Sequence, residues 1–195
     1  MKLNFSKTSP FVRKVMVCAH EKGLADNIEL IGEDQDLTLT NPLSKVPALV
    51  TDEGQAIYDS LVICDYFDGL TPTPVLIPKE SKARTIVLTS HALSNGVMDA
   101  AVATVTEGRR PEAKQWDDFK ALQRGKIERS LDVLNTDVAG YADTVDLSTI
   151  STGAMLGYLD LRMPTLGWRE RCPALATWYG EFSARASMQA TDPGN

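Results

Sequence analysis

Ser9-Pro10-Phe11 decides the fold, because it separates a short apolar stretch typical of a strand, residues 1–6, from an amphipathic helix. Ser is a preferred N-cap and Pro fits the first helical position. The hydroxyl of Ser9 is therefore expected at the positive end of a helix dipole, which favours anions, thiolates included. Taken alone, a helix cap also explains Ser9. The apolar residues that follow recur at the i, i+3, i+4 and i+7 spacing of a helix: Val12, Val15, Met16 and Ala19.

The composition is that of an ordinary soluble globular protein. The chain has 195 residues, of which 43% are hydrophobic and 24% charged, and its net charge is −6. Because acidic and basic residues are interspersed, a nucleic-acid-binding protein with a basic face is disfavoured. The apolar runs fall far below the ~20 residues of a membrane span, and no charged-then-apolar leader precedes the first strand. We therefore expect a cytoplasmic protein that binds neither nucleic acid nor membrane.

The cysteines and histidines predict neither a disulfide framework nor a metal site. The three cysteines are odd in number and widely separated, without a CxxC pair. Cys18 and Cys64 fall in helical patterns and are expected to be buried, whereas Cys172, which precedes a proline, is expected to be partly exposed. His20 and His91 lack a nearby His or Cys partner, so each is expected on a helix face or packed in the core.

Strands and helices alternate over the first seventy residues. Gly23 is a natural end for the first helix, and Asp52-Glu53-Gly54 is typical of a hairpin turn. Residues 32–44 are polar and turn-rich, with at most a short helix. Strands are predicted at residues 1–6, 28–31, 48–51 and 55–58, and helices at residues 10–22 and 60–69.

The proline-rich stretch at residues 71–78 marks a change of character, since three prolines in seven residues support neither a helix nor a central strand. No convincing strand follows it, so an all-helical domain is expected. Gly153 and Gly157, four residues apart, predict close helix packing in a bundle. Helices are predicted near residues 79–106, 111–138, 147–162 and 174–186.

Two further features of the first domain bear on chemistry. In Asn41-Pro42-Leu43-Ser44-Lys45-Val46-Pro47-Ala48-Leu49, a cis Val46–Pro47 bond would leave the backbone of Val46 free to pair with an extended peptide. A trans proline at a strand entry is the alternative. Asp59-Ser60 opens the next helix, where Ser60 is the expected N-cap. With the first free N–H groups it can hold a carboxylate, while Asp59 can hold an ammonium. This pair suits an α-amino-acid head group, although capping alone also explains it.

Taken in order, these motifs resemble the thioredoxin-like domain of the glutathione transferase family, in its serine-type bacterial form. Residues 124–134 and 157–162 are similar to helices of the helical domain of that family. The resemblance covers nearly the whole chain. It implies an α/β plus all-α fold, with a thioredoxin-like domain over residues 1–75 and a helical-bundle domain over residues 79–195.

The resemblance also implies roles for individual residues. Ser9 matches the position that activates the sulfur of glutathione, and Val46, before a cis Pro47, matches the residue that pairs with its cysteinyl part. Asp59 and Ser60 match the pair that holds the γ-glutamyl head.

Lys45 is expected to face the glycyl carboxylate, and Asp99 to contribute from the helical domain, within the chain or across the interface of a homodimer. Glutathione is the expected co-substrate, with no metal. Asn95 stands where related bacterial sequences often carry an acid. Thr149 stands where the family's capping box carries Asp, so the helix at residues 147–162 is expected to be less well secured.

The expected function is transfer of glutathione to a small electrophile, as in detoxification. Ser9 would donate a hydrogen bond to the thiolate, because no neighbouring base would make it a nucleophile. Phe5 and Ser6 stand where tyrosine-type members carry their Tyr. A glutathione-binding protein with a regulatory or a peroxide- or disulfide-reducing role is the alternative, although Ser9 cannot form a mixed disulfide. The candidates for contact with the second substrate are equally well explained as core residues: Met98, Val102, Trp116, Tyr158 and Trp168.

Overall fold

The computed structural model describes residues 1–32 and 36–194. Its first part holds a four-stranded mixed sheet with strand order β2-β1-β3-β4. β1 pairs in parallel with β2 and antiparallel with β3, and β3 and β4 form the predicted hairpin, where Gly54 takes a φ of +85°. The strands are shorter than predicted: β1 spans Lys2–Asn4, β2 Glu29–Ile31, β3 Ala48–Val50 and β4 Ala56–Ile57.

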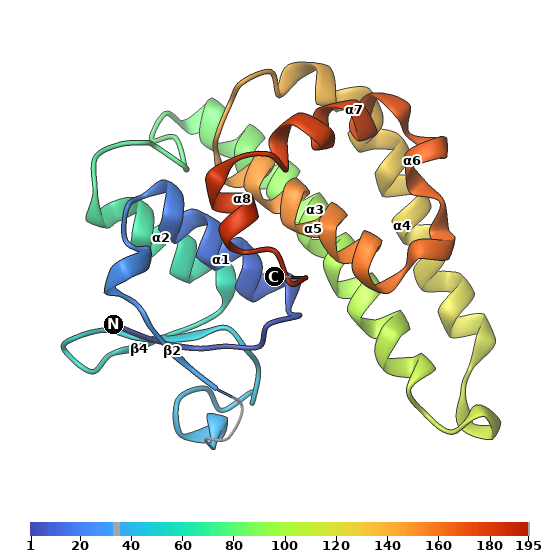
Figure 1. Cartoon of the computed structure of the whole chain (residues 1–195), viewed down its shortest axis with the longest axis horizontal. Coiled ribbons are helices and arrows are strands. Elements are labelled where there is room, and N and C mark those ends of the chain that lie inside the picture. The colour runs from blue at the N-terminus through green and yellow to red at the C-terminus, as the bar shows by residue number, and fades with distance from the viewer. Residues whose placement is uncertain (33–35, 195) are drawn as a thin grey trace.

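Two helices pack beside this sheet, which gives the predicted thioredoxin-like arrangement (Figure 1). α1 (Pro10–Glu21) connects the parallel strands β1 and β2, and it ends where Gly23 takes a φ of +67°. α2 (Ser60–Leu70) follows β4. Of residues 32–44, positions 33–35 lie outside the described residues, and the rest holds one short 3₁₀ helix, Leu37–Leu39.

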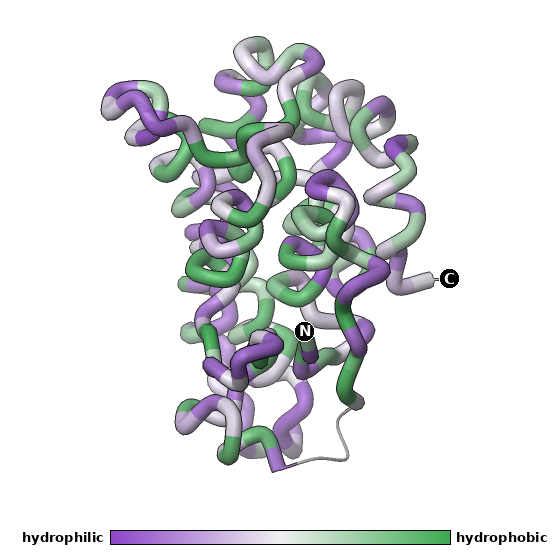
Figure 2. Tube along the Cα trace, turned by 90° about the vertical axis from the view of Figure 1, so that its left-hand side faces the viewer, coloured by the Kyte–Doolittle hydropathy of each residue, from purple (hydrophilic) through white to green (hydrophobic). Residues whose placement is uncertain are grey.

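The second part of the chain is helical in the described residues. α5 lies at its centre, buried from Leu147 to Leu159 and in contact with α1, α3 and α7. Figure 2 shows polar and apolar residues alternating along the helices, as expected of helices that each bury one face. The helices are α3 (Ser81–Gly108), α4 (Asp117–Asp137), α5 (Leu147–Arg162), α6 (Trp168–Arg171), α7 (Pro173–Phe182) and α8 (Ala186–Ala190), with 3₁₀ turns at Glu112–Lys114, Val138–Gly140 and Pro164–Leu166.

The glycines of α5 are close-packing positions, as predicted. A Cβ at Gly153 would lie 2.8 Å from Cε1 of Phe182, and one at Gly157 would overlap Nη1 of Arg13. The start of α5 is better secured than expected. The backbone N–H of Asp146 donates to Thr149 Oγ1 at 3.0 Å while Asp146 Oδ1 accepts from the N–H of Thr149 at 3.1 Å, so Thr completes the capping box.

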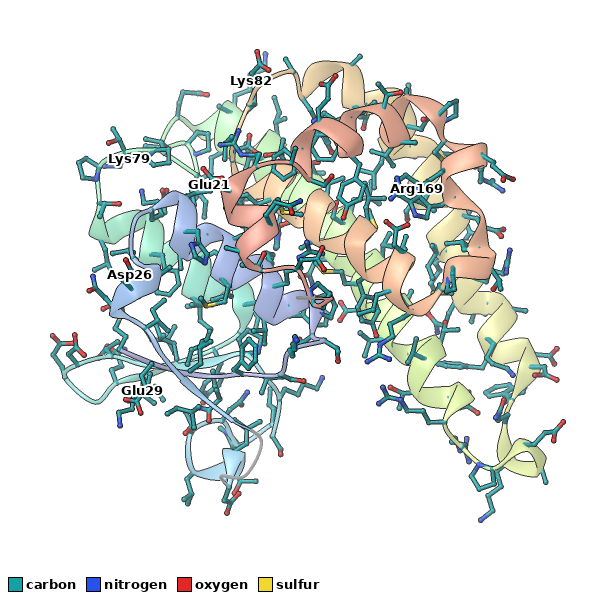
Figure 3. All side chains as sticks on the ribbon, viewed as in Figure 1. Glu21, Asp26, Glu29, Lys79, Lys82 and Arg169 are labelled. Carbon is teal, nitrogen blue, oxygen red and sulfur yellow. The ribbon has the colours of Figure 1, made fainter. Side chains whose placement is uncertain are left out.

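Two predicted helices are shorter in the structure, each because a side chain bonds outside the helix. The helix predicted from residue 111 begins at Asp117, and Gln115 Nε2 donates to the carbonyl of Arg110 at 2.8 Å, which holds the preceding turn. The last predicted helix ends at Phe182. Arg185 then donates to Glu21 of α1, which is labelled in Figure 3, at 3.0 Å, and α8 begins at Ala186.

The expected exposure of Cys172 is wrong, because its side chain turns inward between α6 and α7. The residue has no solvent exposure, and its Sγ lies 3.6 Å from the carbonyl oxygen of Leu131 on α4. Cys18 and Cys64 are buried, as predicted.

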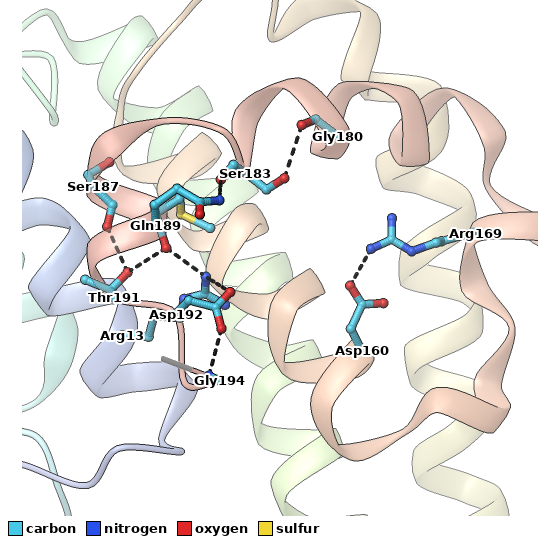
Figure 4. A network of polar contacts seen from close by, with 11 residues as sticks. Arg13, Asp160, Arg169, Gly180, Ser183, Ser187, Gln189, Thr191, Asp192 and Gly194 are labelled. Atoms are coloured by element: carbon cyan, nitrogen blue, oxygen red, sulfur yellow. Dashed lines mark hydrogen bonds and ion pairs between the residues drawn. The ribbon is translucent and has the colours of Figure 1, made fainter.

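Two buried cations tie distant segments together. Arg13 Nη2 donates to the carbonyl of Met188 at 3.1 Å and lies 3.7 Å from a carboxylate oxygen of Asp192, which joins the C-terminal segment to α1 (Figure 4). Lys22 Nζ donates to Asp68 Oδ1 at 3.0 Å and to the carbonyls of Thr71 and Pro74, at 2.7 and 2.6 Å. The proline-rich stretch is therefore held against the first part of the chain.

Within the described residues, none of the helices is both long enough and apolar enough to span a bilayer.

Candidate functional site

A cavity of about 470 Å³ lies where the start of α1, the loop before β3, the start of α2 and one face of α3 meet. These segments are far apart in the sequence; the first three carry motifs that were singled out locally, and the resemblance alone pointed to α3. The lining includes all seven predicted site residues: Ser9, Lys45, Val46, Pro47, Asp59, Ser60 and Asp99.

The N-terminus of α1 presents hydrogen-bond donors at this cavity. Ser9 is the N-cap, and its Oγ accepts from the N–H of Val12 at 3.3 Å. Oγ accepts in that bond and donates to no acceptor in the described residues, so its own hydrogen stays free to donate. The N–H of Phe11, in the first turn, has no partner in the described residues either. Ser9 and Phe11 thus offer two donors at the positive end of the helix dipole.

The loop before β3 presents an unpaired backbone. The Val46–Pro47 bond is cis, and neither the N–H nor the C=O of Val46 has a hydrogen-bond partner in the described part of the chain. Asn41, 2% exposed, holds the loop, since its Nδ2 donates to the carbonyl of Lys45 at 2.8 Å and its Oδ1 accepts from the N–H of Leu43. This arrangement can accept an extended peptide in the manner of an added strand.

The start of α2 differs from the prediction in one respect. Ser60 was predicted to be the N-cap, but Asp59 is the cap and Ser60 is the first helical residue. The reason is local: Asp59 keeps an extended backbone, and its Oδ1 accepts from the N–H of Leu61 at 3.0 Å. Across residues 1–32 and 36–194, the hydroxyl and N–H of Ser60 have no hydrogen-bond partner, so they remain available at the cavity.

α3 lines the cavity with residues spaced three or four apart, among them Asn95, Asp99, Val102 and Thr106, and its C-cap Arg109 continues this face. Asp99 accepts from Asn95 Nδ2 at 3.3 Å. Burial at the cavity wall raises the pKa of its carboxyl, and Lys45 acts in the opposite direction. Asp99 belongs to the cavity of its own chain.

Lys14 lies behind this face and was not predicted to bear on the site. It has no solvent exposure, and its Nζ donates to Asn95 Oδ1 at 2.9 Å, so Asn95 connects Lys14 to Asp99. Burial lowers the pKa of Lys14. No sequence signal marks this lysine, because a cation within a helix is usually exposed and nothing local indicates that α3 covers it.

The candidates for second-substrate contact separate into three groups. Val102 and Tyr158 line the cavity. Met98 and Trp168 are core residues, and Trp168 Nε1 donates to Asp160 at 2.8 Å. Trp116 is 62% exposed and lies beside Phe119, outside the cavity lining.

The described residues contain no group of three His, Cys, Asp or Glu side chains that could hold a metal ion. His91 is packed between α3 and α5, where its Nδ1 lies 2.8 Å from Ser151 Oγ. Burial, reinforced by the charge of Lys14, lowers the pKa of His91 to about 3.

Comparisons with known proteins agree on one family. Residues 8–70 match the family model described as glutathione S-transferase, N-terminal domain. Over 99% of its length the chain is 39% identical to the uncharacterized GST-like protein YibF of Escherichia coli (strain K12), of which 98% is covered.

Solved structures of a glutathione transferase family member from Pseudomonas fluorescens Pf-5 are also similar to this chain. One, with bound glutathione, has 43% identity, a TM-score of 0.95 and coverage of 98% of both chains. Another, with bound S-(propanoic acid)-glutathione, has 44% identity, a TM-score of 0.93 and coverage of 99% of both chains.

Proposed function

Because this chain belongs to the glutathione transferase family, we propose that it binds glutathione and transfers it to an electrophilic small molecule. The observation that carries the proposal is a set of hydrogen-bonding groups without partners in the described residues, gathered around one cavity. They are the hydroxyls of Ser9 and Ser60 and the backbone of Val46. Unpartnered polar groups at a cavity indicate a polar ligand.

Glutathione fits these groups end to end. Its γ-glutamyl carboxylate would accept from Ser60 at the N-terminus of α2, and its ammonium would lie between Asp59 and Asp99. The cysteinyl backbone would pair with Val46, and the glycyl carboxylate would face Lys45. Glutathione bound in the structure of the Pseudomonas fluorescens relative supports glutathione as the ligand.

The proposed chemistry centres on Ser9. Its free hydroxyl hydrogen would donate to the sulfur, and the dipole of α1 would favour the negative charge there. A free thiol has a pKa of about 8.5, and such surroundings lower it, so thiolate becomes abundant near neutral pH. The thiolate then attacks the electrophilic carbon. A C–S bond forms, and the leaving group departs with its electron pair.

The test begins with retention on immobilised glutathione, followed by turnover of 1-chloro-2,4-dinitrobenzene and of electrophiles from other classes. Turnover that needs Ser9 supports the proposal. Tight glutathione binding without turnover of any electrophile would instead favour the alternative, a glutathione-binding protein with a regulatory role. For the disulfide-reducing alternative the discriminating variant is Ser9→Cys, because only a thiol at that position can form a mixed disulfide.

We also propose that the protein is a cytoplasmic homodimer with a role in detoxification. Exposed apolar side chains on α2 and α3 support the dimer: Val62 is 49%, Leu70 45% and Ile86 62% exposed. Light scattering across a concentration series tests it. A mass of one chain at all concentrations would contradict the dimer.

A further inference from the structure

The face of α3 that lines the cavity, together with the C-cap residue Arg109, carries opposite charges at its two ends. Asp99 lies at one end, near Asp59, and Arg109 lies ten positions later, about 15 Å along the helix axis. Val102 and Val105 line the cavity between them. The Asp99 end therefore holds two carboxylates with Lys45 beside them, whereas Arg109 supplies a cation at the other end, with an apolar section in between.

The guanidinium of Arg109 has no carboxylate partner in the described residues. The adjacent Arg110 behaves differently, because its Nη1 donates to Glu107 at 3.0 Å. Glu107 is further occupied by the N–H of Trp116, at 2.8 Å. The carboxylate of Glu107 is thus bound to other groups, and the guanidinium of Arg109 is available to a ligand.

Tyr158 contributes a second free donor to the cavity, within electrostatic range of Arg109. It projects from α5 into the cavity lining and is 7% exposed, yet its hydroxyl has no hydrogen-bond partner across the described ranges. Burial raises the pKa of Tyr158, so the hydroxyl keeps its hydrogen. The charges of Arg162 and Arg109 lower that pKa, but burial is the larger effect. Arg162 likewise has no ion pair with a described residue.

We infer that the Arg109 end of the cavity binds a carboxylate carried by the electrophile, and that the enzyme selects electrophiles with a carboxylate over neutral ones. Arg109 would form the ion pair and Tyr158 would donate a hydrogen bond to the same group. The inference rests on the proposed function, because it takes glutathione to occupy the opposite end, with its sulfur at Ser9.

The binding test uses two glutathione adducts that differ only in charge, S-(2-carboxyethyl)glutathione and its amide, S-(2-carbamoylethyl)glutathione. Calorimetry gives the dissociation constants of both adducts and of glutathione itself. The wild type should bind the carboxylate about tenfold more tightly than the amide, as expected of one charge-assisted contact.

Arg109→Gln should abolish this preference, and Tyr158→Phe should reduce it about threefold. Arg110→Gln is the matched control: it removes the same net charge from the neighbouring residue, whose guanidinium is already paired, and it should retain the preference.

Turnover provides a second readout with 4-chloro-3-nitrobenzoate and 4-chloro-3-nitrobenzamide. In both, the thiolate forms a C–S bond as chloride leaves with the electron pair. Each enzymatic kcat/KM is divided by the uncatalysed rate with glutathione, because the two rings differ in reactivity. The ratio should favour the benzoate in the wild type and in Arg110→Gln, and be lost in Arg109→Gln.

Each failure has a distinct signature. Equal binding of the two adducts by a wild type that binds glutathione would overturn the carboxylate inference while leaving the proposed function intact. The same holds if Arg110→Gln loses the preference as fully as Arg109→Gln. A wild type that binds neither glutathione nor its adducts would overturn both.

Discussion

Along the interface of α3 and α5 the buried polar side chains bond to one another, whereas around the cavity several polar groups have no partner in the described residues. At the interface, His91 lies 2.8 Å from Ser151 and Ser94 lies 2.9 Å from Thr152. At the cavity, the hydroxyls of Ser60 and Tyr158 and the hydrogen of the Ser9 hydroxyl remain free.

Polar side chains therefore have two different roles in this molecule, one in stability and one in binding. A buried polar group that is paired contributes to stability, and removing its partner is costly. A polar group that faces a cavity without a partner contributes little to stability and is available to a ligand. Substitutions at the interface should therefore change the free energy of unfolding, and substitutions at the cavity should change binding or turnover.

The largest effect is expected for Ser9→Ala. Loss of the donor to the thiolate should lower kcat about 100-fold and raise the pKa of the bound glutathione thiol by about one unit. The ultraviolet absorbance of the thiolate, followed against pH, measures that pKa, and calorimetry should show affinity for glutathione within about threefold of wild type. Ser94→Ala is the paired control, because it removes a bonded hydroxyl and should change stability but not turnover. Equal kcat in Ser9→Ala and wild type would remove Ser9 from the mechanism.

The second-largest effect is expected on the pH dependence of stability, through His91 at the interface of α3 and α5. The pKa of His91 falls from 6.5 to about 3 on folding, so between these values only the unfolded chain takes up a proton there. Stability should therefore decrease as the pH falls below 6.5, by about 2 kcal/mol at pH 5 from this residue. Urea unfolding at several pH values measures the slope. His91→Gln should flatten it, and an unchanged slope would show that other groups carry the acid sensitivity.

Asp59→Asn tests the cavity side with little structural change. Asn caps helices as well as Asp, so the melting temperature should stay within about 2 °C while the negative charge is lost. Affinity for glutathione should fall about five- to tenfold if the carboxylate holds the ammonium. Asp65→Asn, an exposed acid later in α2, is the charge-matched control. Equal affinity in both variants would exclude Asp59 from the binding site.

The smallest effect is expected for Thr149→Ala at the start of α5. The variant loses the bond that the N–H of Asp146 donates to Thr149 Oγ1, which should cost about 1 kcal/mol of unfolding free energy. Thr149→Ser retains a hydroxyl and should stay within about 0.5 kcal/mol of wild type. Thermal unfolding of both variants measures the difference, and glutathione affinity should remain unchanged.

Local signals predicted much of the fold, and the segments that they singled out meet at one cavity. The helix at residues 147–162 has the predicted bounds, because Asp146 caps its start and the pattern ends at Arg162. Ser9 and the Val46–Pro47 segment are equally local features. The cap of α2 was misplaced by one residue, since Asp59 and Ser60 are both good caps and only the backbone decides between them.

What the sequence could not reveal depends on contacts between distant positions. Lys14 is buried because α3 covers it, and Asn95, its partner, lies 81 residues away. Arg13 reaches Met188 across 175 residues. No spacing rule for a single helix or strand contains these pairings.

The anchoring of the proline-rich stretch by Lys22 has a consequence for how the molecule could be divided or recombined. Lys22 donates to the carbonyls of Thr71 and Pro74. Further along, the N–H groups of Leu76 and Ile77 donate to the carboxylate of Asp68 in α2, at 2.8 and 3.0 Å. The segment up to Ile77 is thus held by hydrogen bonds against the first part of the chain and is not a flexible linker. A chimera that exchanges the helical part for that of another family member should be joined after Ile77. The backbone at that point is held in place, so the new segment would start from the same position and direction as the native one.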